Sequence, residues 1–289
     1  MITVFTSTYN RAYLLPRLYE SLKNQTFKDF EWLIVDDGST DGTHDLVDGW
    51  INEELLDIRY YYQENGGKHR AINRGALLAK GEWFFIVDSD DYLPDNSLEI
   101  ANKWIATIKD DDTFAGVCGI KKDINSNLHS KFPFEMLDVS PLRINEYAKG
   151  DKAEIFKTAI LGKYPFPDIP GENFCAEGLV CSRIGLKYKI RYFNETIYFC
   201  EYLKGGLTKL SIRNRRLSSS YTLMLYREQI RYQPTLRGKV QASINYWRFV
   251  WFNKHNSRFT DIPFFSYLFM PLGFLKMLLD NKLIVKDTV

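Results

Sequence analysis

Three aspartates follow an apolar segment in the first third of the chain. Residues 83–87 are consecutive aromatic and aliphatic residues, which predicts a strand buried on both faces of a sheet. Asp88, Asp90 and Asp91 come directly after it, where open α/β sheets bind their ligands. Because Mg²⁺ and Mn²⁺ prefer carboxylate oxygens and are often shared with phosphates, the pattern indicates a metal site for a nucleotide diphosphate. The alternative is an acidic turn in which Asp91 or Asp95 caps the next helix.

Two earlier segments repeat this arrangement. Residues 2–6 and 31–35 are typical of buried strands, and the polar residues 7–10 and 36–43 follow them. Helical patterns come after both turns, and the first has leucines at helical spacing, namely Leu15, Leu18 and Leu22. Strand, polar turn and helix in repeated order predict a βαβ series. We therefore expect the three turns to open on one edge of the sheet.

Several motifs in a fixed order make the chain similar to glycosyltransferase family 2. The motifs are residues 4–11, 21–31, 35–41, 65–68, 71–75, 79–82 and 88–91. The resemblance weakens after them and extends to about Leu210. It implies a GT-A fold, which is a Rossmann-like, mostly parallel sheet flanked by helices. It also implies a nucleotide-diphosphate sugar donor and, usually, inversion at the anomeric carbon.

The same resemblance assigns donor-binding roles to individual residues. Tyr9 matches the aromatic residue that lies against the base, and Ser7 belongs to the same loop. Asp37 matches the carboxylate that hydrogen-bonds the uracil ring in uridine-dependent members, which favours a UDP-sugar. Asp88 matches the residue near the ribose, and Asp90 matches the ligand of Mn²⁺ or Mg²⁺.

One position departs from the family pattern. Many members have Ala-Arg-Asn where this chain has Ile72 in the middle position, and that Arg helps to hold the phosphates. Lys68, His69 or Arg70 could supply the missing charge. We favour Lys68, because it directly follows two glycines that let the backbone approach a ligand closely. The alternative is a solvated surface lysine.

An inverting transfer also needs a carboxylate base on the acceptor side. The candidates are Glu177 and Glu172. Glu177 aligns with the acidic helix start of the family, although Gly178 occupies the position of the second acidic residue that is often the base. Glu172 is the second candidate, and its alternatives are orienting the acceptor or capping a helix. Residues 201–208 resemble the family's segment that closes over the diphosphate, or form an ordinary Gly-Gly turn.

The sequence predicts two regions. Residues 1–210 form the GT-A domain, with a nucleotide-sugar half at 1–110 and an acceptor half at 111–210. Residues 211–289 form a helical extension rich in aromatic and basic residues.

Within this extension, residues 262–275 are almost without charge, but this run is too short to span a bilayer and contains two prolines. Cations at Arg258, Lys276 and Lys282 flank the run, so we expect residues 259–279 to contact a membrane surface. The alternative is packing on the catalytic core or in a homodimer interface.

Composition limits the remaining possibilities. The net charge is +2 over 289 residues, and no basic block precedes the last third, which argues against a nucleic-acid surface. The four cysteines lack CxxC spacing, so we expect buried thiols in a reducing compartment. Met1 leads directly into a predicted strand, with no signal peptide before it. These features favour a cytoplasmic protein at the inner face of the cell membrane.

The sequence thus predicts a metal-dependent, inverting glycosyltransferase that adds a sugar from a nucleotide-diphosphate donor to a growing cell-surface glycan or lipid-linked glycan. Two alternatives stay open. A sugar-phosphate nucleotidyltransferase has a related sheet, but its first loop is rich in glycine, whereas residues 7–10 contain none. A catalytically inactive relative that binds glycan or serves as a scaffold would not need Asp37, Asp88 and Asp90, which are all present.

Overall fold

The chain consists of two compact units in a computed structural model that describes residues 1–125, 131–201, 211–253 and 261–286. The first unit comprises residues 1–166 and 183–202, and the second comprises residues 167–182 and 203–289. Residues 167–182, which the sequence places in the GT-A domain, group with the C-terminal helices in the structure.

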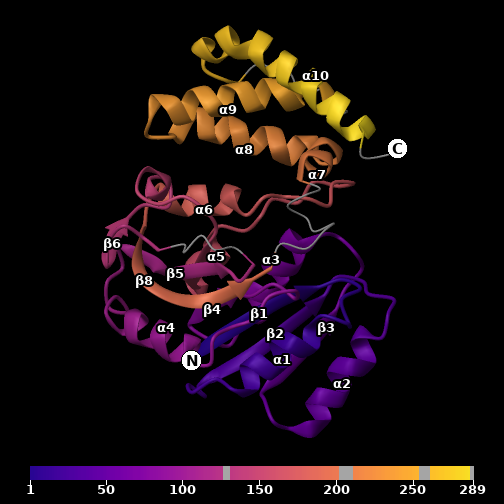
Figure 1. Cartoon of the computed structure of the whole chain (residues 1–289), viewed down its shortest axis with the longest axis vertical. Helices are drawn as coiled ribbons and strands as arrows, with labels where there is room; N and C mark the ends of the chain where they lie inside the picture. The colour runs from indigo at the N-terminus through magenta and orange to yellow at the C-terminus, as the bar shows by residue number, and fades with distance from the viewer. Residues whose placement is uncertain (126–130, 202–210, 254–260, 287–289) are drawn as a thin grey trace. The chain divides into compact units, whose positions relative to one another are not determined.

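A mixed, mostly parallel sheet of eight strands forms the first unit (Figure 1). The order across the sheet is β3-β2-β1-β4-β7-β5-β8-β6, with β7 and β6 antiparallel to their neighbours. The strands are β1 (Ile2–Thr8), β2 (Phe30–Asp36), β3 (Ile58–Tyr62), β4 (Trp83–Ile86), β5 (Phe114–Asp123), β6 (Met136–Val139), β7 (Lys152–Lys157) and β8 (Lys189–Cys200). The expected GT-A type architecture is confirmed.

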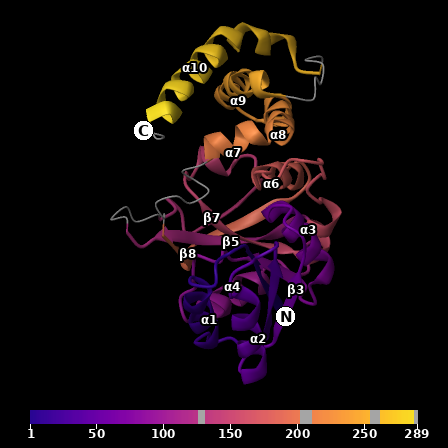
Figure 2. The ribbon, with the colours of Figure 1, turned by 90° about the vertical axis from the view of Figure 1, so that its right-hand side faces the viewer.

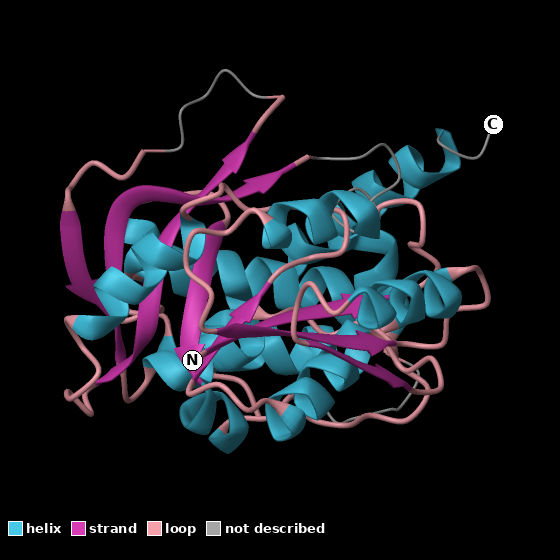
Figure 3. Cartoon of the chain, turned by 90° about the horizontal axis from the view of Figure 1, so that it is seen from below, coloured by secondary structure: helices cyan, strands magenta, loops and turns pink. Residues whose placement is uncertain are grey.

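Helices lie on both faces of this sheet (Figure 3). They are α1 (Leu15–Lys23), α2 (Thr43–Glu53), α3 (Lys68–Leu78), α4 (Ser97–Ala106), the 3₁₀ turn η1 (Ile144–Glu146) and α5 (Thr158–Lys163). The leucines predicted to share one face of α1 are completely buried against the sheet. Tyr19 of α1 stacks on Trp50 of α2, with ring centroids 4.3 Å apart, and both pack beside Trp32 of β2.

Strand β8 is long and irregular, since it extends over the twelve residues Lys189–Cys200. The register between β5 and β8 shifts between Cys118, which pairs with Tyr192, and Ile120, which pairs with Thr196. The extra residues on β8 therefore form a bulge, which bends the strand without ending it.

The three polar turns meet at one edge of the sheet, as the βαβ pattern predicts. The Asp37 amide donates to the Thr8 carbonyl at 2.8 Å, which joins the ends of β2 and β1. The Val87 amide donates to the Phe5 carbonyl at 2.8 Å, which ties the start of the loop after β4 to β1. The loop after β1 is further tied to the loop after β2, because the Thr40 amide donates to Asn10 Oδ1 at 2.8 Å.

The second unit is helical (Figure 2). Its helices are α7 (Ser211–Leu217), α8 (Ser219–Tyr232), α9 (Leu236–Phe249), the 3₁₀ helices η2 (Val250–Phe252) and η3 (Phe264–Phe269), and α10 (Met270–Lys286), while α6 (Gly178–Gly185) crosses the boundary between the units. Its core gathers Leu223 and Ile230 of α8 with Tyr246 and Trp247 of α9. Phe265 of η3 packs against this cluster. The expected helical extension is therefore present.

A buried carboxylate connects the first three strands of the sheet to the turn before β4. Glu31 is completely buried and accepts hydrogen bonds from Thr3 Oγ1 at 2.6 Å, from Arg59 at 2.8 Å and from the Lys80 amide at 2.6 Å. Burial acts to raise the pKa of the Glu31 carboxyl, but these hydrogen bonds outweigh it and hold the pKa below its ordinary value.

We expect Glu31→Gln to lower the free energy of unfolding by about 3 kcal/mol at neutral pH, because it leaves the Arg59 guanidinium without its partner charge. Urea unfolding measures this loss. Glu20→Gln is the control: its side chain is 59% exposed in an ion pair with Lys23, so it should change stability by less than about 0.5 kcal/mol.

The pH dependence of the stability of wild type and Glu31→Gln tests the role of Glu31 a second time. The folded pKa of Glu31 lies below its unfolded value of about 4.5, so its contribution is complete above that pH and is lost as the pH falls through the folded pKa. The stability difference between wild type and Glu31→Gln should therefore shrink on acidification. A difference that stays constant from pH 7 to pH 3 would contradict this assignment.

Candidate active site

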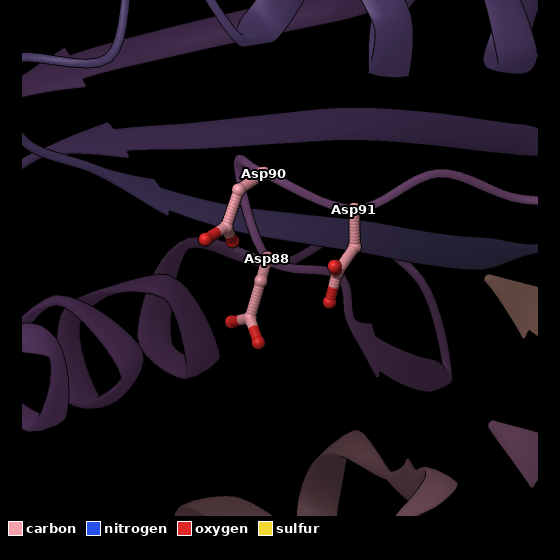
Figure 4. A group of neighbouring side chains, drawn as sticks. All are labelled: Asp88, Asp90 and Asp91. Atoms are coloured by element: carbon pink, nitrogen blue, oxygen red, sulfur yellow. The ribbon is translucent and has the colours of Figure 1, made fainter. Parts of the chain in front are cut away.

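The carboxylates of Asp88, Asp90 and Asp91 lie together on the loop after β4 (Figure 4). Each offers an oxygen atom within 4.8 Å of the oxygens of the others. Their exposure differs, since the side chains of Asp88 and Asp90 are 30% and 25% exposed and that of Asp91 only 5%. Asp88 and Asp90 therefore face the solvent-accessible part of the cluster.

Three cations from other parts of the first unit surround the cluster. Lys68 Nζ at the start of α3 lies 2.5 Å from Asp88 Oδ1. Lys121 Nζ on β5 lies 3.0 Å from Asp91 Oδ2 and 3.6 Å from Asp88 Oδ2. Arg11, on the loop after β1, lies 3.8 Å from Asp90 Oδ2. The mutual repulsion of three carboxylates is thereby offset by residues from α3, β5 and the first loop.

Asp91 is held inside the unit and does not cap a helix. Its Oδ2 accepts a hydrogen bond from the Tyr198 hydroxyl at 2.8 Å, and the Tyr198 oxygen in turn accepts one from the Asp88 amide at 2.9 Å. Helix α4 begins after Asn96 without any side-chain cap. The alternative in which Asp91 or Asp95 caps this helix is therefore wrong, because Asp91 is engaged with β5 and β8.

The surroundings push the pKa values of Asp88 and Asp91 apart. Burial acts to raise the pKa of Asp88, but the ammonium groups of Lys68 and Lys121 hold it well below its usual range. Burial raises the pKa of Asp91 to about 6, and the charge of Asp88 adds to this rise, while Lys121 opposes it. Asp91 therefore takes up a proton at a higher pH than Asp88 does.

The donor atoms of this cluster suit a hard divalent cation. All three are carboxylate oxygens, the ligand type that Mg²⁺ and Mn²⁺ prefer. Asp91 is the least exposed of the three and is held by Tyr198 and Lys121, whereas Asp88 and Asp90 are partly exposed and so are better placed to reach such an ion. The prediction of Asp90 as a ligand is compatible with this geometry.

Asp37 organises the loop after β3. It is 3% exposed, and its carboxylate accepts four hydrogen bonds, from Gln63 Nε2 at 2.7 Å, Gly66 N at 3.0 Å, Gly67 N at 2.7 Å and Asn65 Nδ2 at 3.3 Å. A carboxylate has about four acceptor sites, so all are in use here. A uracil ring would have to replace the side-chain amide of Gln63 or Asn65 to bind Asp37.

The other donor-side residues lie around this loop. Tyr9 follows β1 and is 50% exposed, and Ser7 is half-buried on β1 itself. Lys68 is the first residue of α3, directly after Gly67, whose φ of +96° strongly favours glycine. Ile72, at the position where many relatives have Arg, is 1% exposed in the buried face of α3. An Arg at that position would be buried, whereas Lys68 reaches Asp88.

The two candidate bases belong to the second unit and differ in their surroundings. Glu172 is 4% exposed, and its carboxylate accepts hydrogen bonds from Ser220 N at 2.8 Å and Tyr221 N at 3.0 Å, in the first turn of α8. It therefore acts as a helix cap, which is one of the alternatives that the sequence allows. Glu177 is exposed and immediately precedes α6.

Sequence reasoning missed three residues around the carboxylates, namely Arg11, Lys121 and Tyr198. Lys121 could have been found from the sequence, because it is a charged residue near the carboxyl end of an apolar strand. Arg11 could have been found because it directly follows the first polar turn. Of the predicted closing segment 201–208, residues 202–208 lie outside the described part of the chain.

The sheet order and the acidic loop at its edge define the GT-A type of sugar-nucleotide transferase fold. The sequence profile of Glycosyl transferase family 2 matches residues 3–168, which is more than half of the chain. The chain belongs to this family. This agrees with the resemblance drawn from the motifs of the first hundred residues.

Curated relatives match the N-terminal part of the chain. Glycosyltransferase GlyG of Streptococcus pneumoniae is 36% identical over 117 residues, which cover 40% of this chain and 38% of the relative. Chondroitin synthase of Pasteurella multocida is 31% identical over 125 residues, covering 43% of this chain and 12% of that protein. The chain thus spans well under half the length of these relatives.

Solved structures share the fold over most of the chain. TarS of S. aureus in complex with UDP superposes with a TM-score of 0.62 at 22% identity, covering 86% of this chain and 70% of that one. The mannosyltransferase PcManGT of Pyrobaculum calidifontis, in complex with GDP-Man and Mn²⁺, has a TM-score of 0.61 at 21% identity, covering 94% and 72%.

The contrast between Glu172 and Glu177 can be tested by matched substitutions. Glu172→Gln should lower the free energy of unfolding by about 1–2 kcal/mol, because an amide nitrogen would face a backbone donor of α8. Glu177→Gln should leave stability unchanged and lower sugar transfer by about 100-fold or more, as loss of a general base does. Unfolding curves, transfer rates and nucleotide affinity separate the effects. Near-normal transfer by Glu177→Gln would contradict its assignment.

Proposed function

We propose that the chain transfers a sugar, with inversion, from a nucleotide-diphosphate donor to a glycan or lipid-linked glycan that grows at the cell surface. The observation that carries this proposal is the cluster of Asp88, Asp90 and Asp91 at the edge of a GT-A sheet, beside Lys68. The family match and the nucleotide complexes of structures with this fold support it.

In this proposal the chain's own residues bind and orient the donor. Asp90 and Asp88, two residues apart, would hold a divalent cation, Mn²⁺ or Mg²⁺, which would supply positive charge for the departing diphosphate. Lys68 contributes an ammonium group to phosphate binding. The N-terminus of α3, where Lys68 lies, adds the positive end of the helix dipole. Tyr9 lies against the base, with Ser7 in the same loop.

The transfer itself is a single displacement. The acceptor hydroxyl oxygen attacks the anomeric carbon, the bond from that carbon to the diphosphate oxygen breaks, and the nucleoside diphosphate leaves with the electron pair. Glu177 accepts the hydroxyl proton. Glu177 is exposed just before α6, whereas Glu172 is buried and its carboxylate accepts hydrogen bonds from two backbone amides of α8.

A UDP-sugar is the favoured donor. Asp37 would accept the N3–H of uracil after Gln63 or Asn65 turns away, and cytosine has no N3–H to give. The complexes of TarS with UDP and with UDP-GlcNAc support this choice, while the complex of PcManGT with GDP-Man makes the guanine nucleotide the competitor to test.

We expect UDP with Mn²⁺ to raise the melting temperature more than GDP or CDP with Mn²⁺, because a ligand that binds the folded state stabilises it by mass action. Asp90→Asn should remove the Mn²⁺-dependent part of this shift and lower transfer roughly 100-fold or more. Asp95→Asn, at an exposed position of the same loop region, is the control and should behave like wild type.

Each competing function gives a different outcome. A larger shift with GDP would refute the uridine donor, and full turnover in the presence of a chelator would refute the metal. An inactive binding protein would show a nucleotide or glycan shift without any donor consumption. A nucleotidyltransferase would consume nucleoside triphosphate and sugar phosphate rather than the nucleotide sugar.

The second unit carries an apolar surface that α10 presents outward. Phe264 and Leu268 of η3 and Leu272, Leu275 and Leu279 of α10 are each more than half exposed, and we call these five residues the C-terminal apolar face. Among residues 270–281 of α10, the buried ones are Gly273, Met277 and Asp280. This part of the helix therefore buries a small, a flexible and a charged residue and exposes its leucines, the reverse of an ordinary surface helix.

We propose that this face contacts the cytoplasmic leaflet of the cell membrane. Residues 211–289 contain 13 Lys and Arg and 4 Asp and Glu, a net charge of +9, whereas the whole chain carries +2. An apolar face on this strongly basic region matches an anionic bilayer surface, as the sequence predicts for residues 259–279. Among the described residues, no helix is long and apolar enough to cross a membrane.

We expect the protein to float with vesicles that contain anionic lipid at low salt, and Leu268→Asp with Leu275→Asp to abolish flotation. Leu55→Asp with Leu77→Asp is the matched control, because those leucines are 59% and 83% exposed in the first unit. Absence of wild-type flotation would contradict the membrane contact. A dimer in light scattering that the first pair of substitutions dissociates would instead identify a homodimer interface.

A further inference from the structure

Lys121 enters the carboxylate cluster from a different part of the sheet. It lies on β5, in register with Tyr198 of β8, and its side chain is 15% exposed. Its Nζ is 3.0 Å from Asp91 and 3.6 Å from Asp88, and it lies 4.3 Å from the centroid of the Tyr198 ring. Two carboxylates, an aromatic face and the strand backbone therefore hold this ammonium group in one place.

The charges of the cluster balance when Lys121 is counted. The three carboxylates bring three negative charges, and Lys68, Lys121 and Arg11 bring three positive charges within ion-pair distance. A divalent cation that enters this site without a donor thus meets little net attraction, whereas the diphosphate of a bound donor adds the negative charge that is missing.

We propose that Lys121 is a built-in counter-cation that makes metal binding depend on the nucleotide diphosphate. It is a positioning residue, because it acts through Asp88 and Asp91 and not on the sugar. This inference rests on the proposed function and deepens it, since it assigns the control of cation affinity at the same site. Removing the ammonium group should tighten binding of Mn²⁺ to the donor-free protein and leave binding in the presence of UDP nearly unchanged.

The test is a Mn²⁺ titration followed by electron paramagnetic resonance, with the full chain, without nucleotide and with saturating UDP. Lys121→Met should bind Mn²⁺ about tenfold more tightly than wild type without UDP, the change expected when a unit charge beside a divalent ion is removed in a polar surrounding. Lys121→Arg keeps the charge and should stay close to wild type. Lys122→Met is the control, because adjacent strand residues point to opposite faces of the sheet.

A second variant tests the sign of the effect if Lys121→Met does not fold. Asp91→Asn leaves Lys121 in excess and should weaken Mn²⁺ binding to the donor-free protein. Equal Mn²⁺ affinities for Lys121→Met and Lys122→Met, or for Asp91→Asn and wild type, would overturn the role of Lys121. If UDP raises the Mn²⁺ affinity of wild type but Lys121→Met and Lys122→Met bind Mn²⁺ equally, only the role of Lys121 fails. If UDP does not raise the wild-type affinity, the proposed donor site fails as well.

Discussion

Electrostatic repulsion among Asp88, Asp90 and Asp91 is the constraint around which the first unit is organised. Three carboxylates within 4.8 Å of one another would separate if nothing compensated their charge. The compensation comes from the start of α3, from β5 and from the loop after β1, so it exists only when the whole sheet is assembled. The fold and the charge of the site are therefore mutually dependent.

The sequence predicted what depends on local pattern. Continuous apolar runs gave β1, β2 and β4, and the polar residues after them identified the edge where Asp37, Asp88 and Asp90 lie. Lys121 could not be placed in the site, because its partners on the loop after β4 are about thirty residues away in sequence and are reached through the sheet order. The bulge that keeps β8 continuous likewise depends on pairing with β5.

Two acidic residues illustrate the limit of motif alignment. Glu172 and Glu177 are alike in type and close in sequence, and only their alignment with the family's acidic helix start distinguished them. The structure distinguishes them by their partners, since the carboxylate of Glu172 accepts hydrogen bonds from two backbone amides of α8. That helix begins more than forty residues later in the sequence. Asp37 is a similar case, because its four internal donors make it a loop anchor as well as a candidate base contact.

In α10, the residues that attach the helix to its unit are different from the apolar residues that it exposes. The helix is joined to α9 by Gly273, which lies against Trp247, and by the ion pair between Asp280 and Arg248 at 2.6 Å. Its leucines add little to that attachment because they are exposed. Mutations can therefore alter what the outer face adheres to without loosening the helix, so this unit can acquire or lose an affinity for a surface while its fold stays the same.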